Sequence, residues 1–299
     1  MGADQAADAT RQQARRAEWA EQAAGYRAYM NEIAEHWRAS GEMLLDALCA
    51  APGMHALDLA CGFGEPALAI AEAVAPDGRV IATDLVPEML ALAAERAEAR
   101  GARNIWFQQA DAERLPFPDA SFDRVSCRFG VMYFPDVARA LGEMRRVLRP
   151  GGRVALAVWG PAEGNTLVRS LAVVDEYVPT PPPEPDTPHL FRFAAVGTLG
   201  AALRDAGFRR VEEVQRTLAQ PWPLPAEQAW RVVLDTSPPL RHAVEDLTVE
   251  RRAAVRDAVL ANFRALSDGR RLNFFAPVIV AAGMREAWEE STSVRMSPT

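Results

Sequence analysis

Short apolar runs alternate with segments of helical periodicity between residues 55 and 160. The apolar runs predict strands at 55–60, 79–83, 104–109, 122–128 and 152–159. The periodic segments between them predict helices near 65–75, 87–100 and 136–148. Apolar strands that alternate with helices are typical of a parallel sheet with helices on both faces. The pattern therefore predicts an α/β fold with its sheet in this part of the chain.

The segments on either side follow different patterns. Residues 17–50 predict one or two helices with an aromatic face, formed by Trp19, Tyr26, Tyr29 and Trp37. The Pro-rich residues 179–188 cannot form a regular element. The segments after them predict a helix near 195–206, a strand near 210–217, helices over 225–267 and a strand over 272–283. Pro277 either weakens this last strand or marks a bulge. We expect loose chain ends at 1–16 and 291–299.

Composition and charge narrow the class of protein. Of the 299 residues, 49% are hydrophobic, which is enough for a full core and argues against disorder. The net charge is −7, which argues against a nucleic-acid partner because such binders concentrate positive charge. The three cysteines form no C-x-x-C pair, so no metal site or disulfide framework is expected. We find no signal peptide and no apolar run long enough for a membrane span, which predicts a cytoplasmic protein.

The strongest chemical signal is the turn that follows the first predicted strand. Small residues at Ala60, Gly62 and Gly64 let a ligand approach the backbone, and the helix that follows attracts a carboxylate or phosphate at its N-terminus. Gly62, Gly64 and Ala67 also satisfy the dinucleotide pattern, with Asp84 following Gly62 by 22 residues. This motif alone leaves NAD and other adenosine-containing ligands open.

Further motifs follow in order along the chain. They are Asp84 at the end of the second strand, Gln-Ala-Asp-Ala at 109–112, Ser-Phe-Asp at 121–123 and Leu-Arg-Pro-Gly-Gly at 148–152. With them, residues 55–160 resemble the class I S-adenosylmethionine-dependent methyltransferases, and in particular the UbiE-like (methyltransferase type 11) group. Ala60 stands where that family usually has Gly.

The resemblance implies a fold and a division of the chain. The fold is a Rossmann-like seven-stranded sheet whose last strand runs antiparallel between the fifth and sixth. Residues 1–54 would form an N-terminal helical cap, and residues 55–299 the methyltransferase domain. Within that domain, the cofactor core would occupy 55–160, and a helical lid would be inserted at about 225–268.

The resemblance also implies which residues bind S-adenosylmethionine. Asp84 would bind both ribose hydroxyls, and Asp111 and the Ala112 amide would bind the adenine. The full set of expected cofactor contacts is Tyr26, Tyr29, Asp58, Ala60, Gly62, Gly64, Asp84, Leu85, Met89, Asp111, Ala112 and Arg128. Structural roles stay open for some of them: Asp84 as a helix N-cap, Asp111 as a turn former, Met89 as a gap filler and the Arg128 side chain as a surface ion pair.

The implied reaction is methyl transfer to carbon, oxygen or nitrogen of a small, largely apolar acceptor, such as a quinone, a phenol or a natural-product intermediate. His36 and Tyr133 are the candidate catalytic residues. The candidates for lining the acceptor pocket are Trp222, Trp230, Leu234 and Phe263. Two alternatives remain, a non-catalytic S-adenosylmethionine-binding regulatory protein and an NAD-dependent dehydrogenase. A homodimer is also left open.

Overall fold

The computed structural model describes residues 16–17, 19–179 and 187–286. The predicted loose end at 291–299 and nearly all of that at 1–16 therefore lie outside the described residues, as does most of the Pro-rich segment. None of the described helices is long and apolar enough to cross a membrane.

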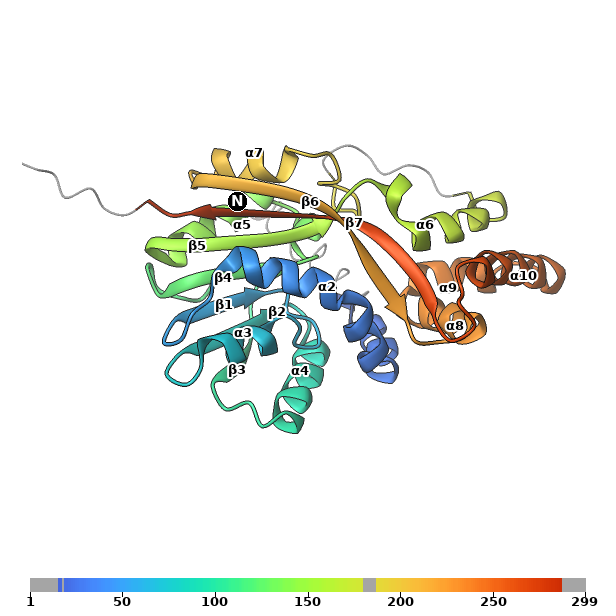
Figure 1. The fold of residues 1–299 in the computed structure, drawn as a ribbon, viewed down its shortest axis with the longest axis horizontal. Coiled ribbons are helices and arrows are strands. Elements are labelled where there is room, and N and C mark those ends of the chain that lie inside the picture. The colour runs from blue at the N-terminus through green and yellow to red at the C-terminus, as the bar shows by residue number, and fades with distance from the viewer. Residues whose placement is uncertain (1–15, 18, 180–186, 287–299) are drawn as a thin grey trace, which may run out of the picture.

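A seven-stranded sheet forms the centre of the molecule, in the order β3-β2-β1-β4-β5-β7-β6 (Figure 1). The first five strands pair in parallel, whereas β7 is antiparallel to both β5 and β6. This order confirms the predicted fold class, including the antiparallel last strand. The strands are β1 (His55–Leu59), β2 (Arg79–Asp84), β3 (Ile105–Gln109), β4 (Phe122–Arg128), β5 (Leu148–Trp159), β6 (Arg209–Trp222) and β7 (Leu272–Met284).

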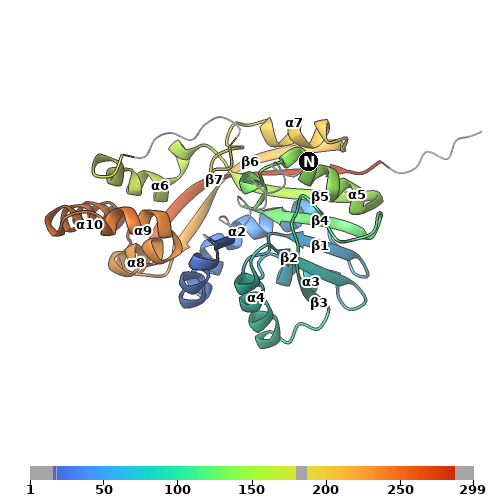
Figure 2. The same ribbon diagram turned by 180° about the vertical axis from the view of Figure 1, so that it is seen from behind.

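Helices cover both faces of this sheet (Figures 1 and 2). Right-handed connections that lead in opposite directions from the centre of a sheet place their helices on opposite faces. Accordingly α3 (Ala67–Val74) and α4 (Pro87–Ala99) lie on one face, and α5 (Val137–Val147) and α7 (Thr198–Asp205) on the other. The long α2 (Met30–Leu48) packs across β4, β5, β7 and β6 on the face opposite α5 and α7.

The last two strands extend well beyond the sheet. β5 ends at Trp159, opposite Val278, but β6 and β7 continue to pair with each other as far as Trp222 and Leu272. They form a two-stranded ribbon, and the helices that connect them lie at its tip (Figure 1). A second buried cluster there packs Trp230, Phe263 and Phe274. These helices are α8 (Ala226–Thr236), α9 (Pro238–Glu245) and α10 (Val249–Ala265), with α6 (Thr166–Leu171) beside them.

Pro277 neither weakens β7 nor introduces a bulge, so that prediction is wrong. β7 is an internal strand and keeps its register with β6 through Pro277. The Pro277 carbonyl accepts a hydrogen bond from the Gly160 amide, 2.8 Å away. Because the N and the C=O of one residue in an antiparallel strand point to the same side, the Pro277 nitrogen also faces the side on which β5 has just ended. The missing N–H therefore removes no ladder hydrogen bond. A Cβ at Gly160 would lie 2.8 Å from the Pro277 Cβ, so glycine makes room for the ring.

Candidate functional site

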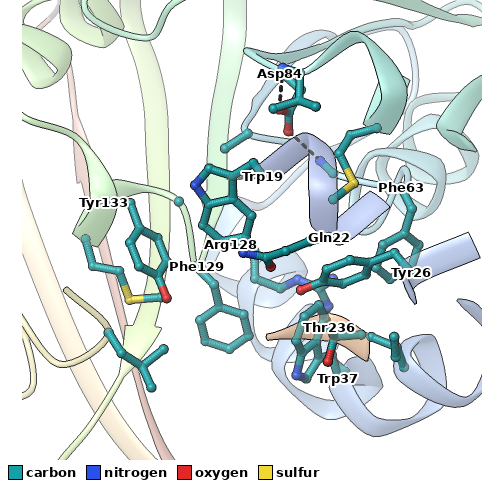
Figure 3. Close-up of a pocket in the computed structure, with 18 of the residues that line it drawn as sticks. Trp19, Gln22, Tyr26, Trp37, Phe63, Asp84, Arg128, Phe129, Tyr133 and Thr236 are labelled. Atoms are coloured by element: carbon teal, nitrogen blue, oxygen red, sulfur yellow. Dashed lines mark hydrogen bonds between the residues drawn. The ribbon is translucent and has the colours of Figure 1, made fainter. Parts of the chain in front are cut away.

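A cavity of about 520 Å³ opens at the carboxyl ends of the first five strands (Figure 3). It lies where the connections of β1 and β4 lead away in opposite directions, which is where ligands bind in open α/β sheets. Its walls come from the turns after these strands, α2, the end of β6, and α8 and α9. The N-terminal helix, residues 19–28, and α6 contribute further walls.

The turn after β1 adopts left-handed backbone conformations, with φ of 51° at Ala60, 52° at Gly62 and 97° at Gly64. Ala60 and Gly62 line the cavity, but Gly64 does not. A Cβ at Gly64 would lie 3.3 Å from the Ala93 Cβ, so this glycine lets α4 pack closely. Ala60 is strained as a non-glycine residue at positive φ. Gly130 accommodates its methyl group, because a Cβ there would lie 2.5 Å from the Ala60 Cβ.

Asp84 is held at the end of β2 by two backbone amides. Its Oδ2 accepts a hydrogen bond from the Gly62 amide at 2.9 Å, and its Oδ1 accepts one from the Val86 amide at 3.0 Å (Figure 3). Burial raises the pKa of this carboxyl, and the two amides oppose that rise. The N-cap of α4 is Val86, so Asp84 does not take that alternative role. Each oxygen keeps lone-pair capacity for a ligand hydroxyl.

The wall beside Asp84 is formed by Leu85, Met89, Asp111 and Ala112, all of which line the cavity. Asp111 also shapes its own turn, because its Oδ1 accepts a hydrogen bond from the Glu113 amide at 2.9 Å. Its predicted turn-forming and ligand-facing roles are therefore compatible. Met89 is 4% exposed and belongs to the buried cluster, so it both fills space and faces the cavity.

Asp58 is fully buried beneath this turn and does not line the cavity. Its Oδ1 accepts a hydrogen bond from the Ser126 hydroxyl at 2.6 Å, whereas its Oδ2 has no hydrogen-bond partner among the described residues. Burial raises the pKa of this carboxyl to about 7. An unpaired buried carboxylate oxygen is costly, and it would be stabilised by a nearby cationic ligand.

Arg128 is buried at the end of β4, which excludes the predicted surface ion pair. Its guanidinium donates to the Trp37 carbonyl at 3.1 Å and to the Glu65 carbonyl at 2.9 Å. Its Cζ lies 5.5 Å from the centre of the Trp37 ring and 5.8 Å from that of Phe129. Burial lowers its pKa to about 10, so it stays charged at neutral pH. In Figure 3 it lies in the middle of the cavity wall.

Of the two tyrosines expected at the cavity, only Tyr26 lines it. Its ring lies 5.6 Å from that of Phe63 and 6.0 Å from that of Trp37, and burial raises its pKa to about 12. Tyr29 lies elsewhere than expected. Its hydroxyl donates a hydrogen bond to Asp235 Oδ2 at 3.0 Å, which ties the start of α2 to α8.

The two candidate catalytic residues, His36 and Tyr133, both line the cavity. His36 Nδ1 lies 2.9 Å from the Gln220 carbonyl. Since a carbonyl only accepts, the proton sits on Nδ1 and Nε2 carries a lone pair. Burial lowers the pKa of His36 to about 4, so the ring is neutral at pH 7. The Tyr133 ring contacts the edge of Trp19, with 5.1 Å between centres (Figure 3).

Of the four predicted acceptor-pocket residues, Trp222 lines the cavity. Trp230, Leu234 and Phe263 pack within the helices at the tip of the ribbon instead. Several lining residues were not predicted: Phe63, which lies within the glycine motif, and Phe129, Trp159, Asn165, Leu167, Leu171, Leu190, Gln22 and Gln220, which lie outside every motif. Phe129 and Trp159 could have been found, because both directly follow or end predicted strands at the ligand-binding edge of the sheet.

The N-terminal helix closes the cavity by bridging both sides of it. On the sheet side, Arg27 forms an ion pair of 2.6 Å with Glu95 of α4. On the ribbon side, Glu21 pairs with Arg241 and lies 3.2 Å from His242. Gly25 packs directly on the end of α8, where a Cβ would overlap the Asp235 carbonyl.

The described residues contain no group of three or more His, Cys, Asp or Glu side chains arranged to hold a metal ion. Cys61 lines the cavity, but burial raises the pKa of its thiol well above the ordinary value, which suits a packing residue rather than a nucleophile.

Comparison with known proteins agrees with this geometry. The ubiE/COQ5 methyltransferase family matches residues 28–162. A demethylmenaquinone methyltransferase of Thermus thermophilus is 49% identical over 105 residues, which cover 35% of this chain and 47% of that protein. This chain thus spans about half the length of such relatives. The nocamycin O-methyltransferase of Saccharothrix syringae is 32% identical over 262 residues, covering 83% of this chain and 91% of that protein.

Solved structures share the fold at lower identity. The YcgJ protein of Bacillus subtilis has a TM-score of 0.55 at 22% identity, covering 84% of this chain and 100% of that one. The [4+2]-cyclase SpnF has a TM-score of 0.50 at 20% identity, covering 84% and 81%. A cyclase with this fold shows that the fold alone does not define the reaction. The family follows from the sequence relatives: the chain belongs to the UbiE-like group of the class I S-adenosylmethionine-dependent methyltransferases.

Proposed function

We propose that this protein transfers a methyl group from S-adenosylmethionine to a small, largely apolar acceptor. The observation that carries the proposal is the continuity of the cavity. The cofactor motifs of β1, β2 and β3 form one end of it, and a chamber of aromatic and aliphatic side chains forms the other. A donor and an acceptor bound at the two ends would therefore meet without crossing solvent.

The residues of the first end fit the cofactor. Asp84 presents a fixed carboxylate, which suits the two ribose hydroxyls. Asp111 and Ala112 would hold the adenine. For the amino-acid part, Arg128, which lines the cavity, suits the carboxylate. When bound, S-adenosylmethionine supplies a methyl group already activated on a sulfonium, so the protein needs no nucleophile of its own.

The residues of the second end would position the acceptor and remove its proton. The neutral His36, with its lone pair on Nε2, is the proposed general base. Tyr133 stands on a different wall and is proposed to orient the acceptor. The N-terminal helix would act as the cap and α8–α9 as the lid, excluding water while the two substrates are aligned. The predicted division into cap, core and lid is proposed on this basis.

The lining of the chamber indicates the class of acceptor. Among the described residues that line the cavity, Arg128 is the one permanently charged cation, and it is proposed to bind the carboxylate of the cofactor. A phosphorylated acceptor would therefore find no available cation, whereas a quinone, a phenol or a natural-product intermediate would find aromatic surfaces. The similarity to nocamycin O-methyltransferase over most of both chains favours the natural-product class.

Two measurements test this proposal. Calorimetry should show binding of S-adenosylhomocysteine, the demethylated cofactor, and loss of that binding in Asp84→Ala. Transfer of labelled methyl from S-adenosylmethionine should then be detected on a panel of phenols, hydroxyquinones and polyketide-like enols. Absence of cofactor binding by a folded protein refutes the proposal. Tight cofactor binding without transfer to any acceptor favours a regulatory protein, and binding of NADH instead favours a dehydrogenase.

A further inference from the structure

Two side chains that line the cavity each carry a buried N–H group with no hydrogen-bond partner among the described residues. They are Nε2 of Gln220 and Nε1 of Trp222, on side chains that are 2% and 4% exposed. Buried donors are nearly always paired, because an unpaired one loses its hydrogen bond to water without replacement. Among the described residues only one other buried side-chain atom, the Asp58 Oδ2, is left in this state. The two donors therefore need an acceptor atom that the described part of the chain does not supply.

The fold brings these donors together at one place. Gln220 and Trp222 are two residues apart at the end of β6, and alternate residues of a strand point to the same face. Both line the cavity. Their partners across the ribbon are Phe274 and Leu272, which offer no polar side chain. The surface around these two side chains is therefore apolar across the ribbon. Within it, the Trp222 N–H and the Gln220 amide are neighbouring hydrogen-bond donors.

His36 lies against the same two residues. Its ring centre is 4.7 Å from that of Trp222, and its Nδ1 is bonded to the Gln220 backbone carbonyl. The cluster thus contains two donors that need an acceptor atom and one imidazole nitrogen with a lone pair.

We propose that Gln220 and Trp222 form an oxygen-binding subsite for the methyl acceptor. Their N–H groups would bind a carbonyl or other hydrogen-bond-accepting oxygen of the acceptor, which places a neighbouring hydroxyl beside His36. The acceptor class is then an apolar molecule with a hydroxyl next to a carbonyl, such as a hydroxyquinone or an enol. This inference rests on the proposed methyltransferase function.

The first test measures stability and needs no acceptor. Gln220→Leu and Trp222→Phe remove one donor each and keep most of the apolar volume. If the two donors are unpaired in the ligand-free protein, both variants should keep or exceed the wild-type melting temperature in the absence of ligands. Gln215→Leu, on the exposed part of β6, and Trp230→Phe, buried outside the cavity, are the matched controls. If Gln220→Leu or Trp222→Phe lowers the melting temperature markedly and the control variants do not, the donor has a structural role and the inference is overturned.

The second test measures ligand binding with defined probes. With S-adenosylhomocysteine present, the protein should bind 2-hydroxy-1,4-naphthoquinone, which has a hydroxyl beside a carbonyl, more tightly than 1-naphthol, which lacks the carbonyl. Each variant should weaken the first probe on the order of tenfold and leave the second nearly unchanged. Equal affinity for the two probes, equal losses in the variants, or no binding of the hydroxyquinone overturns the inference.

The binding of S-adenosylhomocysteine distinguishes failure of the proposed methyltransferase function from failure of the oxygen subsite. Gln220→Leu and Trp222→Phe should bind it with wild-type affinity, because neither residue belongs to the cofactor motifs. If the wild type does not bind it, the proposed function fails. If binding is intact and only the probe discrimination is missing, the oxygen subsite fails and the proposed function stands.

Discussion

The buried carboxyl of Asp58 gives the sharpest quantitative prediction. Burial raises its pKa from 3.8 to about 7 in the folded protein. A rise of about 3 units corresponds to about 4 kcal/mol, at 1.36 kcal/mol per unit. The folded state retains the proton over a pH range in which the unfolded state has lost it. The contribution of this group is therefore fully present below pH 4 and is lost as the pH rises to about 7.

Asp58→Asn removes this titration and keeps the size of the side chain. The free energy of unfolding of the variant relative to the wild type should rise by up to about 4 kcal/mol between pH 4 and pH 8. The difference must be used because His36 acts in the opposite sense: its pKa is lowered to about 4, so its contribution is lost as the pH falls from 6.5 to 4. That contribution is common to both proteins and cancels.

The assay is urea unfolding at a series of pH values between 4 and 8, with constant ionic strength. Asp77→Asn, the same change at an exposed position, is the matched control. Any loss from the Asn amide, such as a poorer bond to Ser126, is independent of pH and shifts the whole curve without changing its slope. A difference between Asp58→Asn and wild type that does not change with pH would refute the reasoning.

Three further predictions concern the cavity. Asp84→Ala should weaken S-adenosylhomocysteine on the order of 100-fold by calorimetry, since two charge-assisted hydrogen bonds are lost, and an unchanged affinity would contradict the ribose assignment. Gly25→Val should raise the KM for both substrates and lower the melting temperature, because the side chain separates the N-terminal helix from α8; wild-type values would exclude closure there. His36→Gln should lower kcat about 10²- to 10⁴-fold with the cofactor affinity unchanged, and full activity would exclude it as the base.

The parts of the site that could be predicted are those fixed by local spacing. Gly62 and Asp84 each follow a strand, and parallel strands bring their carboxyl ends to one edge of the sheet, so the contact between the Gly62 amide and Asp84 follows from the strand pattern. Arg128 could be located at the same edge for the same reason. The burial of Arg128 could not be predicted, because it depends on a hydrogen bond to the Trp37 carbonyl of α2, 91 residues away in the sequence.

The tyrosines show a second limit of local reasoning. Tyr26 and Tyr29 are three residues apart, and on a continuous helix such residues share a face. The helix is interrupted at Tyr29, whose φ of −130° and ψ of 25° are not helical. The two rings therefore diverge, one toward Phe63 and the other toward Asp235. No proline marks this break, and the Tyr29 hydroxyl forms its hydrogen bond with Asp235 of α8, 206 residues later in the sequence.

The ribbon explains why the acceptor side was the least predictable part of the molecule. Residues 218–222 pair only with β7 beyond the end of β5, so their strand structure depends on a partner about 50 residues later in the sequence. That extension carries Gln220 and Trp222 to the cavity and, at its tip, the helices that meet the N-terminal helix. In the core, a substitution such as Ala60 needs a compensating glycine at 130. The ribbon carries none of the residues proposed to bind the cofactor, so no cofactor motif marks Gln220 or Trp222 in the sequence.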